Sequence, residues 1–169
     1  MTANFDGGRF RQVLGYLPTG VVIVTGVDAQ GEPSGITIGS FVSVSLDPPL
    51  VGFFVGVSSR SWPAIEQGNS FCANVLSDQQ TELCWKFAKD PIEGSASRFD
   101  GITWEKSPNG LPMLEDSIAQ IDCTIESTTP AGDHVFVLGR VTTLHTPNEA
   151  NDAMIFYKGK VGGVARHGI

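Results

Sequence analysis

Three serine hydroxyls and one guanidinium occur together in segment 58–62, Ser-Ser-Arg-Ser-Trp, directly after the apolar run 50–57. A strand that leads straight into a helix would present free backbone N–H groups and a partial positive charge, which bind phosphate readily. The serine hydroxyls and the guanidinium of Arg60 would add hydrogen-bond donors at the same point. The segment therefore predicts a phosphate pocket, and a plain serine N-cap beside an exposed arginine is the simpler alternative.

More hydroxyl side chains lie upstream, in region 35–45. The region holds two glycines and four hydroxyl residues: Gly35, Gly39, Thr37, Ser40, Ser43 and Ser45. Small residues let a ligand approach the backbone closely. The hydroxyl and backbone N–H groups could then bond the polar edge of a flat ring system, or they could form the wet face of a sheet.

A third candidate is the imidazole of His134, which follows Gly-Asp at an expected turn. Gly-Asp favours turns, so His134 is either simply the first residue of the next strand or a cleft-lining side chain that touches a bound cofactor. The other two histidines, His145 and His167, lack ligand spacing, and we therefore expect no metal site.

The composition argues against several function classes. The net charge is −7 and Lys and Arg do not cluster, so we expect no nucleic-acid binding. No apolar run approaches the roughly 18 residues of a membrane helix, and no secretory signal is recognisable. Three cysteines without a C-x-x-C pair indicate free thiols and a cytoplasmic protein. Phosphate-loop, Rossmann and nucleophile-elbow motifs are not found.

These candidates must be positioned by strands and turns with few helices. Apolar runs predict strands over 20–27, 35–46 (a pair or one bent strand), 50–57, 69–76, 117–127, 134–145 and 154–164. Helical spacing and caps predict helices over 8–17, 58–67 and 77–90. Glycine and proline predict turns over 28–35 and 128–133 and an irregular segment over 89–117.

This order of elements predicts a mostly β fold, a closed or half-closed antiparallel barrel in one domain over residues 1–169. Apolar and polar residues alternate through 117–127, which predicts one buried and one wet face for that strand. Charged residues make up only 17% of the chain, so an oligomer or partner is expected to cover part of the surface.

Together the motifs resemble the flavin reductase family, the small reductase partners of two-component flavin monooxygenases. The resemblance covers nearly the whole chain. Its more specific pieces are Ser-Leu-Asp-Pro-Pro-Leu at 45–50 and Gly-Asp-His at 132–134. Weaker pieces are Phe-Arg-Gln-Val-Leu-Gly at 10–15, Ser-Arg-Ser-Trp at 59–62 and Phe-Tyr-Lys-Gly at 156–159.

The resemblance implies a split β-barrel homodimer that binds FMN or FAD near the dimer interface and uses NADH or NADPH as co-substrate. It places His134, the expected catalytic residue, on the nicotinamide side. It assigns the flavin ring and ribityl chain to Thr37, Ile38, Gly39, Ser40, Phe41, Ser43 and Val44. It assigns the phosphate to Ser58, Ser59, Arg60 and Ser61, and includes Phe87 among the cofactor-binding residues. Departures include Gly39, where the family often has Asn, and Val161, where many members have an aromatic residue.

The predicted activity is hydride transfer from NAD(P)H to FMN or FAD, which would supply reduced flavin to an oxygenase partner. Three other interpretations remain: a flavin carrier or sensor without NADH activity, a split-barrel enzyme that uses a deazaflavin or acts on a pyridoxine-type phosphate, and a structural dimer without a cofactor. The sequence leaves open FMN against FAD, NADH against NADPH, the identity of the oxygenase, and whether flavin is held or released.

Overall fold

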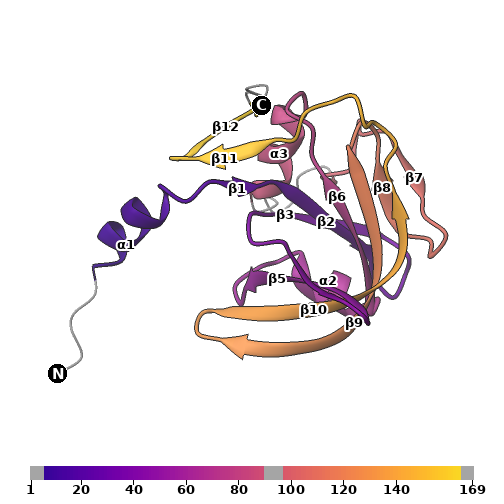
Figure 1. Cartoon of the computed structure of the whole chain (residues 1–169). Coiled ribbons are helices and arrows are strands. Elements are labelled where there is room, and N and C mark those ends of the chain that lie inside the picture. The colour runs from indigo at the N-terminus through magenta and orange to yellow at the C-terminus, as the bar shows by residue number, and fades with distance from the viewer. Residues whose placement is uncertain (1–5, 90–96, 165–169) are drawn as a thin grey trace.

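A long, curved antiparallel sheet organises the computed structural model, which describes residues 6–89 and 97–164 (Figure 1). The strand order in this sheet is β3-β2-β6-β9-β10-β5-β4. The strands are β2 (Val22–Val27), β3 (Pro33–Ile38), β4 (Val42–Leu46), β5 (Pro49–Gly56), β6 (Ser70–Val75), β9 (Ala119–Ala131) and β10 (His134–His145). Every neighbouring pair is antiparallel. The predicted mostly β fold is confirmed, whereas no pairing between described residues joins β3 to β4, so the sheet is open.

Smaller elements flank this sheet. They are α1 (Gly7–Leu14), β1 (Thr19–Gly20), α2 (Trp62–Gln67), α3 (Thr81–Ala88), β7 (Trp104–Lys106), β8 (Pro112–Leu114), β11 (Ile155–Tyr157) and β12 (Lys160–Gly162). β1, β11 and β12 form a second sheet, and β7 pairs with β8. No helix within residues 6–89 and 97–164 is long and apolar enough to cross a membrane.

Apolar side chains of the main sheet are buried on both of its faces. On one face Phe53 lies at the centre of a cluster, with its ring edge-on to Phe71 at 5.2 Å and to Trp62 of α2 at 5.8 Å between ring centroids. On the other face α3 and the segment after it bury Phe87 and Phe99, whose ring centroids are 5.1 Å apart. The sheet is therefore covered on both sides along much of its length, which fixes the strand ends that carry the candidate residues.

One polar row of the sheet is buried and includes Gln120 and Asp122 of the predicted wet face of strand 117–127, whereas Glu126 on that face is exposed as predicted. Thr25 donates to the Pro112 carbonyl oxygen at 2.6 Å, and Gln120 donates to the Leu114 carbonyl oxygen at 2.8 Å. Asn74 lies between them and accepts a hydrogen bond from the Leu114 N–H at 2.8 Å. The row therefore binds the backbone of β8, and the prediction failed because polar side chains can be satisfied by a covering strand as well as by water.

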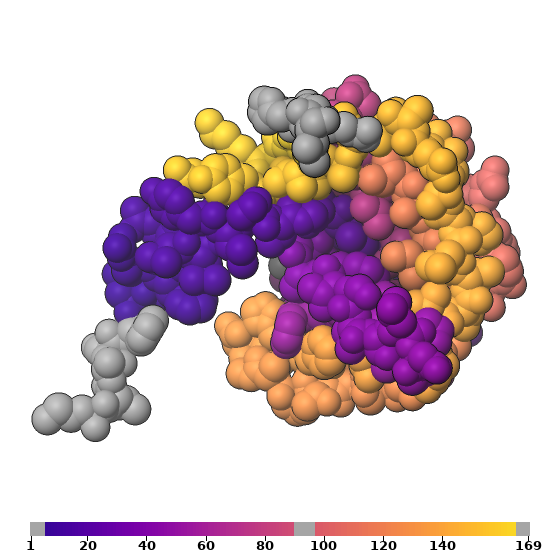
Figure 2. Space-filling model, in the orientation of Figure 1, coloured from indigo at the N-terminus to yellow at the C-terminus, as the bar shows by residue number. Residues whose placement is uncertain are grey.

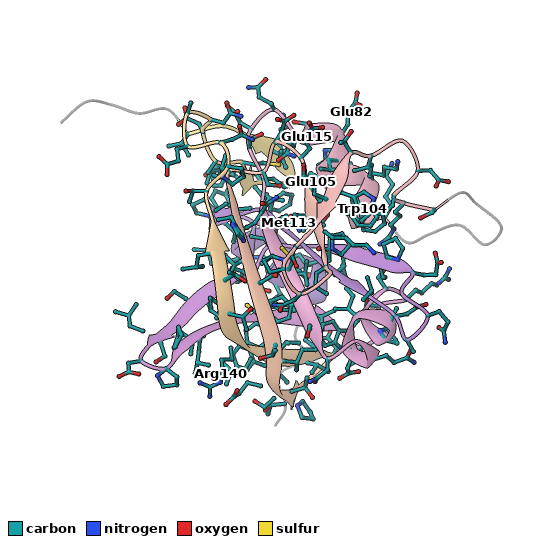
Figure 3. All side chains as sticks on the ribbon, turned by 90° about the vertical axis from the view of Figure 1, so that its right-hand side faces the viewer. Glu82, Trp104, Glu105, Met113, Glu115 and Arg140 are labelled. Atoms are coloured by element: carbon teal, nitrogen blue, oxygen red, sulfur yellow. The ribbon has the colours of Figure 1, made fainter. Side chains whose placement is uncertain are left out.

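The hairpin that covers this row lies in the segment that was expected to be irregular. Figure 3 shows Trp104 and Glu105 of β7 with Met113 of β8 at one end of the view and Arg140 at the other. Arg140 forms a surface ion pair with Glu126, with 2.7 Å between Nη2 and Oε1. The turn of this hairpin contacts the later part of β10, where Asn109 donates to Thr142 Oγ1 at 2.9 Å, and not the β9–β10 turn before His134.

Other predicted boundaries also need correction. The turn expected over 128–133 is shorter, because β9 continues to Ala131 and only two residues separate it from β10. The single strand expected over 154–164 is a hairpin, β11 and β12, whose turn places Lys158 and Gly159 at positive φ. The helix expected over 8–17 ends at Leu14, and the helix expected over 58–67 begins at Trp62.

All three cysteines, Cys72, Cys84 and Cys123, are free and buried. Burial raises the pKa of the Cys123 thiol to about 12, with the nearby Asp122 carboxyl adding to the effect. Burial also raises the pKa of Cys72 and Cys84 above the ordinary thiol value. These side chains behave as small apolar core residues.

Candidate functional site

Two small cavities lie side by side just beyond the end of β5. The first, of about 160 Å³, is lined by Ile36, Gly56, Ser58, Ser59, Ser61, Phe87, Ala88 and Arg98. The second, of about 150 Å³, is lined by Pro33, Ser34, Gly35, Arg60, Ser61, Arg98 and Phe99. Ser61 and Arg98 line both cavities, so they form the boundary between them. All the residues predicted for the phosphate therefore lie around this pair of cavities.

The local chain conformation differs from the strand-to-helix junction that the sequence suggested. The residues after β5 form a turn, and α2 starts only at Trp62 and has six residues. Ser61 is the N-cap residue, as expected, but its side chain makes no capping hydrogen bond. Ser59 takes this role, because its Oγ accepts from the Trp62 N–H at 3.2 Å. A phosphate at this site would therefore meet side chains and turn backbone, not the end of a long helix.

Arg98 is a site residue that sequence reasoning missed. Its Nη1 donates to the Ser61 Oγ at 2.8 Å and to the Gly35 carbonyl oxygen at 2.7 Å, and its Nη2 donates to the Lys89 carbonyl oxygen. The residue lies in the segment expected to be irregular, and 37 positions separate it from Ser61. Only the tertiary structure brings this second guanidinium to the serines.

His134 begins β10 and lies opposite Gly56, the last residue of β5. The Val57 N–H donates to the Asp133 carbonyl oxygen at 3.0 Å, which ties the β9–β10 turn to the segment that leads to the cavities. His134 Nδ1 lies 2.7 Å from Asp133 Oδ1, and this hydrogen bond holds the pKa of the Asp133 carboxyl below its usual value. A carboxylate can only accept, so Nδ1 carries the proton and Nε2 can meet another partner.

The residues predicted for the flavin ring follow the chain from β3, at one edge of the sheet, into β4 at the other edge. Ser40 Oγ accepts from the Phe54 N–H at 2.9 Å, which holds the chain against β5 before β4 begins. Ser43 and Val44 are exposed on β4, whereas Ile38 is buried in the core and Phe41 stacks on Phe53. A ligand along this segment could use the backbone at Ile38 and the exposed surface of β4.

Two of the candidate residues are tied to α3: Thr37 bonds to its backbone, and Phe87 belongs to it. Thr37 Oγ1 donates to the Cys84 carbonyl oxygen at 2.8 Å. Phe87 has no exposed surface, and its ring forms part of the wall of the first cavity. A Cβ on Gly35 would lie 2.6 Å from Phe87 Cε1. The Phe87 ring therefore packs against the Gly35 backbone, in the space that the sequence analysis assigned to a ligand.

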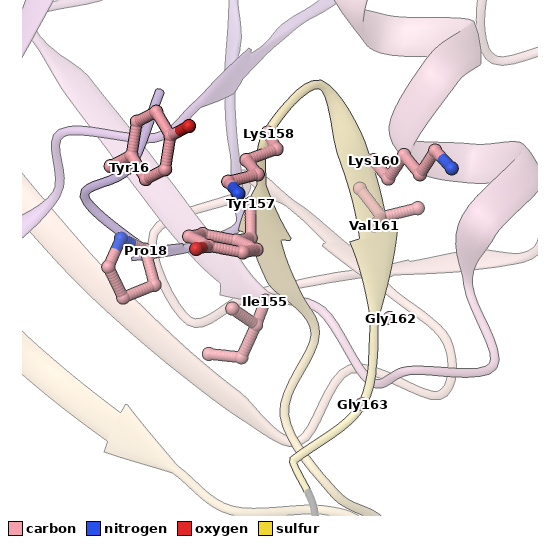
Figure 4. A pocket seen from close by; sticks show the side chains of 9 residues that line it. All are labelled: Tyr16, Pro18, Ile155, Tyr157, Lys158, Lys160, Val161, Gly162 and Gly163. Carbon is pink, nitrogen blue, oxygen red and sulfur yellow. The ribbon is translucent and has the colours of Figure 1, made fainter. Parts of the chain in front are cut away.

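A larger groove of about 760 Å³ lies beside β11 and β12, lined by Tyr16, Pro18, Ile155, Tyr157, Lys158, Lys160, Val161, Gly162 and Gly163 (Figure 4). Lys158 Nζ lies 4.1 Å from the centre of the Tyr16 ring, and the Lys158 N–H donates to the Gly15 carbonyl oxygen at 3.0 Å. These contacts join the chain after α1 to the C-terminal hairpin. Most of the groove surface is carbon, so it differs in character from the polar cavities beyond β5.

The whole of this architecture matches a known family. The sequence model of the flavin reductase like domain matches residues 14–165, which include both cavities and the β9–β10 turn. The chain belongs to the flavin reductase family. The resemblance seen in the sequence motifs is thereby confirmed.

Named members of the flavin reductase family align with nearly the whole chain. A flavin reductase of Pseudomonas putida is 47% identical over 160 residues, covering 95% of this chain and 91% of that protein. The reductase subunit HsaB of a flavin-dependent monooxygenase from Rhodococcus jostii is 44% identical, covering 94% of this chain and 78% of that protein.

Solved flavin reductase structures have the same fold. The homologue of nitrilotriacetate monooxygenase component B from Mycobacterium thermoresistibile is 39% identical, with a TM-score of 0.87 over 94% of this chain and 86% of that chain. The NADH:FAD oxidoreductase SgcE6 from Streptomyces globisporus is 32% identical, with a TM-score of 0.87 over 98% of each chain. The flavin reductase family thus provides both sequence and structural relatives at high coverage.

Proposed function

We propose that this protein is an NAD(P)H:flavin oxidoreductase that supplies reduced flavin to a partner monooxygenase. Its single flavin reductase-like domain, residues 1–169, would work as a split β-barrel homodimer in the cytoplasm. The flavin is FMN or FAD, and the co-substrate is NADH or NADPH. A relative named as a monooxygenase reductase subunit and another named as an NADH:FAD oxidoreductase support this activity and the oxygenase partner.

One observation carries the proposal. The pairing of His134 with Gly56 puts the imidazole at the same end of β5 as the two serine- and arginine-lined cavities. A cofactor with its phosphate in those cavities and its ring along the segment from β3 into β4 would extend past this strand end. The imidazole would then lie where a nicotinamide could stack against the flavin ring.

The chain's own residues bind and orient the reactants. When bound, flavin accepts a hydride from the reduced nicotinamide, and the protein contributes position and electrostatics. Ser58, Ser59 and Arg60 donate hydrogen bonds to the phosphate. With Nδ1 held by Asp133, His134 Nε2 would be available to the nicotinamide carboxamide, so this pair would help to fix the nicotinamide for transfer.

The dimer is proposed from apolar surface that this chain leaves uncovered. No residue of α1 is buried, and Val13, Leu14 and Leu17 are 47–60% exposed. Val42 and Leu46 on the edge strand β4 are exposed as well. Figure 2 shows α1 standing away from the body above a hollow that the β9–β10 hairpin borders. A second copy of the chain would cover these residues and fill the hollow.

The decisive test is NADH oxidation by the purified protein in air, with and without added FMN. We expect oxidation that saturates with FMN. FMN binding without NADH oxidation would favour the carrier or sensor, and no binding of FMN would favour a split-barrel enzyme with another cofactor.

Replacing Arg60 with alanine should weaken FMN binding about ten-fold, because one charge-assisted hydrogen bond to the phosphate is lost. Riboflavin, which lacks the phosphate, should bind to the variant and to the wild-type protein equally well. Flavin fluorescence quenching measures both dissociation constants. Arg140→Ala, which removes an arginine from the Glu126 ion pair, is the control. Equal loss of FMN and riboflavin affinity in Arg60→Ala would contradict this role.

A further inference from the structure

The buried hydroxyl of Ser61 has an unusual hydrogen-bonding state. Ser61 is only 7% exposed, yet it borders both cavities. It occupies the N-cap position of α2 without capping the helix, because Ser59 accepts from the Trp62 N–H. Among the described residues its Oγ accepts from Arg98 and donates to none. A hydroxyl carries one proton to donate, and a buried donor without a partner is costly, so this donor is available to a ligand in the cavities.

Arg98 determines how the Ser61 hydroxyl can form hydrogen bonds. An arginine can only donate, so its hydrogen bond to Ser61 Oγ occupies an acceptor position of the hydroxyl and leaves the proton for a ligand. The same guanidinium is anchored by the carbonyl oxygens of Gly35 and Lys89, which fix its plane. Its charge lies at the boundary between the two cavities, in a protein whose net charge is −7. The ligand acceptor that fits a donated hydroxyl beside a guanidinium is an anionic oxygen.

We propose that Arg98 is a positioning residue for the flavin phosphate, acting through Ser61. The guanidinium orients the Ser61 hydroxyl so that it donates to a phosphate oxygen and adds positive charge behind it. This inference rests on the proposed function, because it assigns the flavin phosphate to these cavities. It adds to the site a residue from the segment after α3, which the motif residues 58–61 do not include.

The test measures dissociation constants for FMN and riboflavin by fluorescence quenching, without NADH. Arg98→Gln should weaken FMN binding about ten-fold or more while riboflavin binding changes less than about two-fold. Ser61→Ala keeps the backbone bonds of Arg98 and should reduce FMN affinity by about five-fold. Arg140→Gln is the matched control and should change neither constant. Circular dichroism melting curves show whether each variant folds.

A double mutant separates positioning from general stabilisation of the fold. If Arg98 acts through Ser61, Arg98→Gln should have a clearly smaller effect on FMN affinity in the Ser61→Ala background than in the wild type. Fully additive effects, or equal loss of FMN and riboflavin affinity in Arg98→Gln, would overturn the inference. If Arg98→Gln does not fold, Ser61→Ala still tests the inference. An unchanged ratio of FMN to riboflavin affinity in Ser61→Ala would overturn it too. Wild-type protein that binds neither flavin would instead reject the proposed function itself.

Discussion

Replacing His134 with alanine should reduce the rate of NADH oxidation about ten- to a hundred-fold, because loss of an orienting contact misplaces the nicotinamide relative to the flavin ring. FMN affinity should remain within about two-fold of wild type, since the imidazole lies across the strand end from the phosphate cavities and is about half exposed. The loss should appear in the KM for NADH, in kcat, or in both.

Steady-state kinetics with varied NADH and a separate FMN titration measure the two effects independently. His145→Gln is the control, because His145 lies at the opposite end of the same strand, β10. Asp133→Asn should have a smaller effect in the same direction, since the amide can still accept from Nδ1 but no longer carries the charge that holds the imidazole. Loss of FMN binding in His134→Ala would show that the imidazole supports the flavin and not the nicotinamide.

The largest expected loss of stability comes from Asn74→Leu, which we expect to lower the free energy of unfolding by about 2–4 kcal/mol. Asn74 has no exposed surface, and its side chain joins two layers of the protein. Its Oδ1 accepts from the Leu114 N–H at 2.8 Å, and its Nδ2 donates to Thr25 Oγ1 at 3.1 Å. Leucine has a similar size, so the substitution leaves little cavity but strands a buried N–H group.

Urea denaturation followed by tryptophan fluorescence measures the change in unfolding free energy. The matched control is Asn109→Leu, because Asn109 also donates from Nδ2 to a threonine hydroxyl, at 2.9 Å, but in an exposed position. That control should shift the unfolding free energy by less than about 0.5 kcal/mol. A comparable loss in both variants would mean that burial of the polar row under β8 contributes little.

The sequence predicted the strands and the site segments because both depend on local chemistry. The apolar run 50–57 and the serines after it appear where expected, and His134 does begin a strand. The strand over 117–127 was also correctly located, although Gln120 and Asp122 of the predicted wet face are buried. Alternation reports which side chains are polar, but whether β8 or water satisfies them depends on a contact far along the chain.

What the sequence could not reveal were contacts between distant segments. Arg98 follows α3 in a region rich in glycine and proline, and nothing nearby indicates that it reaches Ser61. The length of β9 was also missed, because Pro130 and Gly132 predict a turn and the strand continues through the proline before turning. The role of Gly35 was misassigned because the Phe87 ring, which needs its missing side chain, comes from a helix in another part of the chain.

The burial of the three cysteine thiols affects how readily the protein is oxidised. Only the thiolate form of cysteine reacts readily with peroxide, and the raised pKa values of all three cysteines keep them protonated near neutral pH. A protein that releases reduced flavin works beside the hydrogen peroxide that forms when such flavin meets oxygen. Because every one of its cysteines is buried in the core, we expect this chain to resist thiol oxidation wherever reduced flavin meets oxygen.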